Sequence, residues 1–237
     1  MRLSVPVIVA GLFAAGCRPP AESQADHRAE TACPSIASQV DAVKAGEATR
    51  VVAQHALSDT EWESLRGLAG LRELILDAGA ADDSRADLLA GLPDLERLVL
   101  RASPLSDAGF EALGRCTMLR DLNVPQAACT PAGIRALRQL PDLRSLRLGG
   151  VELARAGAEV GGAVAELAYL RSLHLIDVPL GDEGLGAISR MSNLWNLYLD
   201  GAGVSDDAWG RYFETHPRVH AHVDQAHHDR DPRRGHD

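Results

Sequence analysis

Residues 71–76 read LRELIL, and this hydrophobic pattern, L-x-x-L-x-L, decides the fold because it recurs along most of the chain. Further copies, one of them ending in valine, stand at 95–100, 119–124, 143–148, 170–175 and 194–199. Their first leucines are separated by 24, 24, 24, 27 and 24 residues. A hydrophobic pattern with a fixed period of about 20 to 50 residues is typical of solenoid proteins, whose units bury their apolar faces against one another.

Each unit contains a strand pattern followed by a helix pattern. The L-x-L that ends the motif has the alternation of a strand. Downstream, apolar residues recur three positions apart, as at Trp62 and Leu65, which is helical spacing. Ser58 and Glu61 match a capping box at the start of that helix. N-cap candidates stand at the same position of later units: Ser106, Thr130 and Ser205. We therefore predict one short strand, a turn and a helix of about two to three turns per unit.

Two degenerate copies flank the six clear ones. A 24-residue step back from the first copy places Arg50 and Val52 at the second and third hydrophobic positions. The same step beyond the last clear copy gives Arg218, Ala221 and Val223. The unit of 27 residues contains a Gly-Gly pair, and we expect an irregular or lengthened outer segment there. The array is thus predicted to have about six clear and two weak repeats.

The turn before the helix carries a second signature, LSDAGF at 105–110 and LGDEGL at 180–185. Together the motifs resemble the leucine-rich repeat family, in particular its 24-residue bacterial type, over about residues 47–224. The resemblance implies an α/β solenoid with a curved parallel sheet on the concave side and helices on the convex side. The asparagine that long leucine-rich repeats carry after the strand is not regular here. We therefore expect the turn into the helix to be bridged differently.

The first 17 residues read MRLSVPVIVAGLFAAGC and resemble a bacterial lipoprotein signal. The apolar run is too short for a bilayer, which needs about 20 residues, but has the length of a secretory signal. The ending Ala-Ala-Gly-Cys resembles a lipobox, which implies cleavage after residue 16 and acylation of Cys17. The alternative is an ordinary secretion signal with an incidental cysteine.

The residues after Cys17 predict a tether. Residues 17–32 are rich in proline, alanine and charge and have no large apolar residue beyond the cysteine, so we expect them to be disordered. No aspartate follows Cys17, which in the Gram-negative sorting scheme points to the outer membrane. An N-terminal cap is expected at 33–46, before the repeats. The predicted location is the bacterial cell envelope, with attachment to the membrane through the N-terminal lipid.

Composition and motifs argue against nucleic-acid binding and catalysis. The chain of 237 residues has a formal net charge of −9, which disfavours phosphate binding. Hydrophobic residues make up 46% and aromatic residues 4%, so aliphatic side chains must fill the core. There is no G-x-S-x-G, C-x-x-C, H-E-x-x-H or Walker A motif. We therefore expect a monomeric protein that is not an enzyme and needs no cofactor.

The cysteines of the repeats are predicted to be core residues. Cys116 stands in a column that is otherwise leucine or methionine, and Cys129 in one that is otherwise leucine, valine or alanine. The two lie on opposite sides of one strand, too far apart for a disulfide, whose Cα atoms lie within about 7 Å. We expect both to be buried thiols. Cys33 lies before the repeats and has no evident partner.

Side chains between the leucines of each strand should face the concave surface, because side chains alternate along a strand. The predicted surface is polar with charges of both signs, and it has two interpretations. One is a solvated face whose ion pairs contribute little. The other, which we favour, is a surface that binds protein or peptide. The candidate partner-binding residues are Arg97, Asp121, Asn123, Arg147, His174, Asn196, Tyr198 and Asp200.

An alternative function is metal binding or a structural role at the His-rich C-terminal end. His220 and His222 are two residues apart on the last weak strand and should face the same side, and such imidazoles suit zinc, nickel or copper. His174 lies two strands away from His222, about 9–10 Å, too far to share one ion. Candidates for a third ligand are Asp200, Asp224, His227 and His228. The tail 225–237 is polar, however, and we expect it to be disordered.

Overall fold

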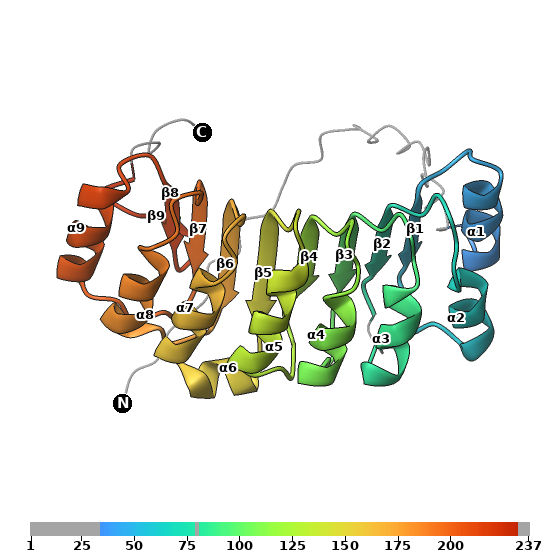
Figure 1. Cartoon of the computed structure of the whole chain (residues 1–237), viewed down its shortest axis with the longest axis horizontal. Helices are drawn as coiled ribbons and strands as arrows, with labels where there is room; N and C mark the ends of the chain where they lie inside the picture. Colours follow the sequence, from blue (N-terminus) through green and yellow to red (C-terminus); the bar gives the residue numbers. More distant parts are fainter. Residues whose placement is uncertain (1–33, 79–80, 232–237) are drawn as a thin grey trace, which may run out of the picture. The chain divides into compact units, whose positions relative to one another are not determined.

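A parallel sheet built in chain order forms one face of the molecule, and the helices form the other (Figure 1). The computed structural model describes residues 34–78 and 81–231. The chain divides into residues 1–33 and a unit of residues 34–237. The predicted signal, Cys17, the tether and Cys33 lie outside the described residues. No helix in the described part is long and apolar enough to cross a membrane.

Eight strands run parallel, and a ninth closes the sheet in the antiparallel sense. The strands are β1 (Arg50–Ala53), β2 (Glu73–Leu76), β3 (Arg97–Leu100), β4 (Asp121–Val124), β5 (Ser145–Gly149), β6 (Ser172–Ile176), β7 (Asn196–Leu199), β8 (His220–Val223) and β9 (Ala226–His227). The helices are α1 (Ile36–Lys44), α2 (Asp59–Leu65), α3 (Asp83–Ala90), α4 (Asp107–Leu113), α5 (Pro131–Ala136), the 3-10 turn η1 (Leu137–Gln139), α6 (Val151–Ala156), α7 (Ala158–Ala165), α8 (Gly181–Ile188) and α9 (Asp206–Thr215). The predicted leucine-rich-repeat solenoid is confirmed.

The leucines of the motif form the core between the sheet and the helices. Leu74, Leu98 and Leu122 pair in register on adjacent strands, and each is at most 1% exposed. Burying one leucine stabilises the fold by about 2 kcal/mol, so the stacked columns supply much of the stability. Cys116 and Cys129 are buried free thiols, as predicted.

The first repeat is one residue shorter than the sequence pattern predicts. Arg50 pairs with Glu73 and Val51 with Leu74, a step of 23 residues. The assignment of Arg50 and Val52 to buried positions is therefore wrong. A step of 24 would bury a guanidinium, whereas the observed register buries Val51 and leaves Arg50 exposed. Helix α1 covers this end, and the Gln39 amide bonds both the N–H and the C=O of Val52, as a further strand would.

Aspartates at the starts of the helices link neighbouring repeats. Asp107 accepts hydrogen bonds from the backbone N–H and the hydroxyl of Thr130, both at 2.7 Å, and from the N–H of Gly133 at 3.0 Å. Asp182 accepts the same pair of bonds from Ser205, and these bonds, the backbone one first, lower the pKa of Asp182. Each such aspartate thus satisfies N–H groups at the next turn or helix start. The sequence lacks a regular asparagine after the strand, and we expected another group to bridge the turn into the helix. These aspartates are that group.

The long repeat places two helices, α6 and α7, on the convex side where the other repeats place one. Gly157 separates them with a φ of +53°, a conformation that glycine adopts without strain. The prediction of a lengthened outer segment is thus confirmed.

Residues 225–231, expected to be a disordered tail, instead fold onto the end of the sheet. Asp224 and Gln225 both have positive φ, as a tight two-residue hairpin requires, and they reverse the chain from β8 into β9. The ring of His228 then packs against Trp209 of α9 at a centroid distance of 4.8 Å. Ring packing of this kind and the hairpin hydrogen bonds order a polar segment that has no hydrophobic period. The rest of the predicted tail lies outside the described residues.

Candidate functional site

The concave face has charges of both signs, and in its N-terminal half they form ion pairs. Glu73 lies between Arg50 and Arg97, with both nitrogen–oxygen distances 3.2 Å. Arg101 pairs with Asp77 at 3.3 Å. Such partly exposed pairs contribute little to stability. In this half of the surface each of these charged side chains has a partner of opposite sign.

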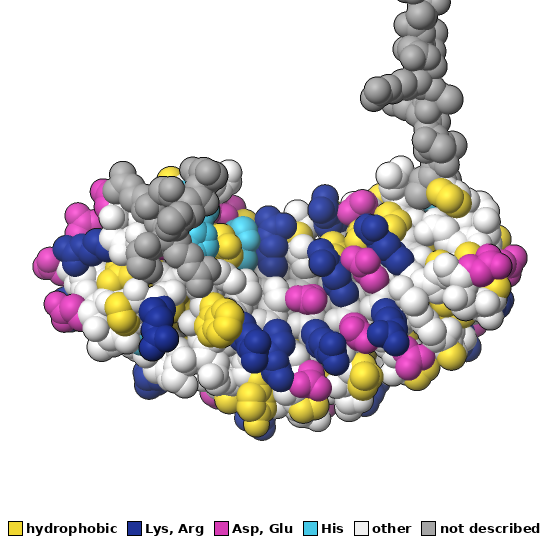
Figure 2. Space-filling model, turned by 90° about the horizontal axis from the view of Figure 1, so that it is seen from above, with side chains coloured by type: hydrophobic (Ala, Val, Ile, Leu, Met, Phe, Trp, Pro, Cys, Tyr) yellow, Lys and Arg dark blue, Asp and Glu magenta, His cyan; other side chains and the backbone are white. Residues whose placement is uncertain are grey.

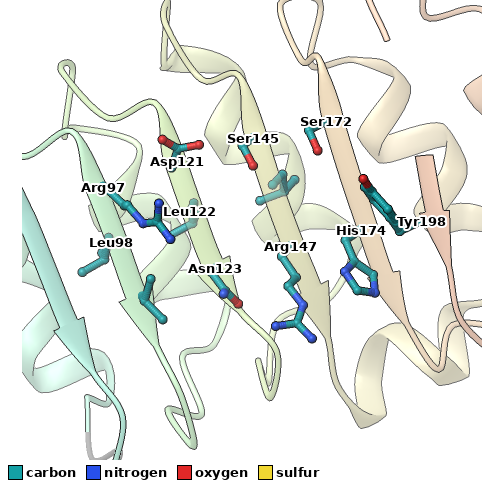
Figure 3. Close-up of a pocket in the computed structure, with 12 residues that line it drawn as sticks. Arg97, Leu98, Asp121, Leu122, Asn123, Ser145, Arg147, Ser172, His174 and Tyr198 are labelled. Carbon is teal, nitrogen blue, oxygen red and sulfur yellow. The ribbon is translucent and has the colours of Figure 1, made fainter. Parts of the chain in front are cut away.

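The central part of the face is hollowed, and its lining comes from strands β3 to β7 (Figure 3). Asp121, Ser145 and Ser172 form one row of side chains across the strands, because the register aligns these positions. Asn123, Arg147 and His174 form the next row. The volume of the hollow is about 190 Å³. A small-molecule pocket usually has about 300–1,000 Å³, so this hollow fits a partner's side chain or a short stretch of backbone better than a metabolite.

Two polar atoms of adjacent residues that line the hollow lack partners. Nε of Arg147 and Oδ1 of Asn123 are buried and take part in no hydrogen bond within the described residues. Their residues are register partners on neighbouring strands, about 4.8 Å apart. A buried donor or acceptor left unsatisfied costs about 1–3 kcal/mol. Neither Arg147 nor Asp121 forms an ion pair with another described residue, in contrast to the N-terminal half of the face.

His174 and Tyr198 form the C-terminal wall of the hollow. Nε2 of His174 lies 2.9 Å from Oδ2 of Asp200, and the side chains are only 24% and 15% exposed. The rings of His174 and Tyr198 are 5.5 Å apart between centroids. Asp200 does not line the hollow, and its carboxylate instead holds the imidazole that does.

Of the eight partner-binding candidates from the sequence, the structure brings six together. These six line the hollow: Arg97, Asp121, Asn123, Arg147, His174 and Tyr198. Asn196 lies on the sheet between Ser172 and His220, outside the hollow.

Two exposed aromatic side chains, which the sequence analysis missed, stand beside arginines at the edge of the sheet. Tyr169 and Trp195 are each 57% exposed. The guanidinium of Arg144 lies 5.5 Å from the Tyr169 ring centroid, and that of Arg171 lies 5.5 Å from the Trp195 ring centroid. Tryptophan, tyrosine and arginine are enriched at binding hot spots. Arg144, Arg171 and Trp195 each directly follow the first leucine of a motif. Comparing this position between repeats would have found them, because it precedes each strand in the same register.

The metal-ligand candidates sort into two groups. His220, His222 and His227 come together at β8 and β9. Asp224 is used elsewhere, since its Oδ1 accepts a hydrogen bond from the N–H of Gly201 at 2.7 Å. The carboxylate of Asp200 holds His174, and the ring of His228 packs on α9, so neither of them completes the cluster.

Comparisons with known proteins find solved structures of similar fold. No family model matches the chain. No curated protein matches it either. An internalin of Listeria monocytogenes, known from a crystal structure, shares 18% identity over 78% of this chain, with a TM-score of 0.43. The match covers 63% of that internalin chain. The likeness is one of fold, and the function must be argued from the side chains of this chain.

Proposed function

We propose that this chain is a non-catalytic protein of the bacterial cell envelope that binds an extended segment of another protein in the concave hollow. The observation that carries the proposal is the pair of unpartnered buried atoms, Arg147 Nε and Asn123 Oδ1. One is a donor and the other an acceptor. A peptide backbone offers both a C=O and an N–H at strand spacing, and would satisfy the two together after the Arg147 and Asn123 side chains turn to expose them.

The rest of the lining favours the same kind of ligand. Asp121 and Arg147 supply opposite charges within one small hollow, which suits a peptide with both polarities better than a simple anion or cation. Tyr198 adds a rigid aromatic wall, which provides contact area at low entropy cost.

Site-specific photo-crosslinking tests the proposal. A photoreactive residue at Ser172, which lines the hollow, should capture a defined protein from extracts of the source cells, identified by mass spectrometry. The same probe at Glu111, exposed on convex helix α4, should not capture it. If the Glu111 probe captures that protein equally well, the concave face is not its binding surface.

Affinity measurements with the captured partner then test the two atoms. A hydrogen bond to a charged group contributes about 1.5–3 kcal/mol, so Arg147→Ala should weaken binding by about 10- to 100-fold. Arg50→Ala is the matched control, because Arg50 lies on the same face but is paired with Glu73 outside the hollow. Equal effects of the two substitutions would contradict the proposed site.

We further propose that acylated Cys17 anchors the protein to a membrane, most readily the outer membrane. The support is the apolar run that ends at Ala-Ala-Gly-Cys. Two or more acyl chains anchor a protein stably, whereas one gives marginal binding. Cell fractionation should find the wild type in membranes and Cys17→Ala released from them. A wild-type protein that is soluble and carries no acyl mass at Cys17 would refute the anchor.

A further inference from the structure

The last two strands bring three imidazoles to one point at the end of the sheet. His220 and His222 lie two residues apart on β8 and project to the same side, and His222 pairs with His227 across the hairpin. One nitrogen of each ring lies within 4.8 Å of the others. Figure 2 shows His side chains gathered toward the C-terminal end of the solenoid. The hairpin thus brings the third imidazole to the first two.

The spacing of the nitrogens is that of ligands around one ion. Nε2 of His220 and Nε2 of His222 are 3.0 Å apart. Two nitrogens bound tetrahedrally to zinc at about 2.05 Å lie about 3.3 Å from each other. A movement of a few tenths of an ångström would therefore place both at bonding distance. The ring of His227 lies 4.2 Å from that of His222 and 5.0 Å from that of His220 between centroids, so it is close enough to join them.

The buried carboxylate of Asp231 lies next to two of the three histidines. The side chain of Asp231 is 0% exposed, and its Oδ2 lies 2.7 Å from Nδ1 of His220 and 3.4 Å from Nδ1 of His227. Oδ2 also accepts from the N–H of Ala221 at 3.3 Å. Histidines that bind metals almost always give their other ring nitrogen to a carboxylate or carbonyl. Nδ1 of His220 lies within ion-pair distance of Asp231 although it makes no hydrogen bond of good geometry, and a proton on this nitrogen would leave Nε2 with the lone pair that a metal requires.

The burial of Asp231 itself calls for positive charge nearby. Asp231 is the only buried acidic residue among residues 34–78 and 81–231. Burying an ionised carboxylate is costly unless it is paired and hydrogen-bonded. The imidazoles of His220 and His227 lie beside it, and a divalent ion held by those imidazoles would place two positive charges just beyond them. The ion would thus add positive charge close to the buried carboxylate.

We propose that His220, His222 and His227 bind one divalent transition-metal ion, with Asp231 as a positioning residue. Three neutral imidazoles suit zinc, nickel or copper, whereas calcium and magnesium prefer oxygen ligands. We take zinc as the expected ion. Three protein ligands leave a fourth position on zinc for water or a group of a bound partner. Tyr198 connects this site to the hollow, because its ring lies 5.0 Å from that of His222.

The ion would also stabilise the C-terminal end of the solenoid. Strand β9 has only two residues, and it covers the last edge of the sheet. An ion bound to both β8 and β9 joins them, and a ligand that binds only the folded state raises the melting temperature. The site thus gives a stability readout that does not depend on any protein partner, so its failure and the failure of the proposed function can be told apart.

Calorimetric titration of the full chain with zinc chloride, without an affinity tag, tests the site. We expect one equivalent to bind with a Kd below about 10 μM, and the melting temperature to rise with zinc. Replacing zinc by cobalt should give the visible absorption of a tetrahedral site. The wild type showing neither saturable binding nor a zinc-dependent melting temperature would overturn the proposal.

Three variants separate the site from adventitious binding. His222→Ala should weaken the stoichiometric binding at least 100-fold. Asp231→Asn, which keeps the shape of the side chain, should weaken it about 10- to 100-fold, as loss of a supporting carboxylate does. His55→Ala is the control, because His55 is an exposed histidine at the other end of the solenoid. Folding of each variant is checked by circular dichroism. If His222→Ala folds and binds zinc like the wild type, or if His55→Ala loses binding equally, the assignment is wrong.

Discussion

Two adjacent glycines in helix α7 should respond in opposite directions to substitution by alanine. A Cβ on Gly161 would lie 2.4 Å from the carbonyl oxygen of Gly184 in α8, and 2.8 Å from its carbonyl carbon. A Cβ on Gly162 would meet nothing within 4 Å. Neither glycine has positive φ, so alanine fits the helical backbone at both positions. The two helices approach closely because neither has a side chain where they cross.

The size of the effect follows from the packing of α7 against α8. Alanine is better than glycine inside a helix by about 1 kcal/mol, and this gain applies equally to both variants. An ordinary carbon–oxygen contact is about 3.3 Å, so Gly161→Ala must push the helices apart by roughly 0.9 Å. Overpacking of this kind costs about 1–3 kcal/mol. We expect Gly162→Ala to stabilise by about 0.5–1 kcal/mol and Gly161→Ala to destabilise by up to about 2 kcal/mol.

Urea unfolding followed by circular dichroism measures both variants against the wild type. The difference in free energy between the two variants isolates the packing term, because the helix-propensity gain cancels. Solenoids can unfold in parts, so the comparison requires equal denaturant slopes for the three proteins. Equal stability of Gly161→Ala and Gly162→Ala, with unchanged slopes, would refute the close crossing of α7 and α8.

Two further predictions concern the links between repeats and the buried thiols. Asp107→Ala removes three hydrogen bonds to Thr130 and Gly133 and leaves their N–H groups unsatisfied, so it should destabilise by about 2 kcal/mol, measured by urea unfolding. Asp107→Asn, which keeps one acceptor oxygen, should cost less, and an equal cost would argue against the charge-assisted bonds. Burial raises the pKa of the Cys116 thiol to about 11 and that of the Cys129 thiol to about 12. The unfolded thiols ionise from about pH 9 while the folded ones stay protonated, so stability should fall above pH 9 by about 1.4 kcal/mol per thiol and pH unit. The double variant Cys116→Val, Cys129→Val should fall less steeply, and reductant should leave the melting temperature of the wild type unchanged; identical alkaline slopes would contradict the thiol assignment.

Sequence reasoning predicts what depends on a repeated local pattern. The alternation of L-x-L sets the register of β2 to β8, so the sequence predicts which side chains of these strands face the concave surface. Helix starts follow from single side chains, and the capping box of Ser58 and Glu61 is present as predicted. The columns that contain Cys116 and Cys129 also place those thiols in the core. Each of these features needs only residues within one unit or at a fixed step to the next.

The features that were missed depend on contacts outside that pattern. The first repeat is one residue shorter than predicted. Its degenerate motif has no leucine that fixes the step to the next repeat, and the burial of Val51 determines the register instead. Strand β9 has two residues, too few for any alternation, and its order depends on the hairpin and on His228 packing against α9. The role of Asp231 requires that hairpin, so no spacing in the sequence could have assigned it.

The concave face has one half in which charged side chains are paired and one half with unpaired polar groups, because two columns of side chains change in character between them. One column alternates in sign through Arg50, Glu73, Arg97 and Asp121, then turns to serine at Ser145 and Ser172. A sign-alternating ladder neutralises each interior charge from both sides. The ladder ends at Asp121. One of its neighbours in the column, Arg97, pairs with Glu73, and the other is Ser145. The adjacent column changes at the same strand, from Ile75 and Val99 to Asn123 and Arg147. The backbone is nearly the same in every repeat, so the difference between the two halves comes from the side chains that change at β4. This change places unpaired polar groups in the middle of the face, where a partner can contact several strands at once.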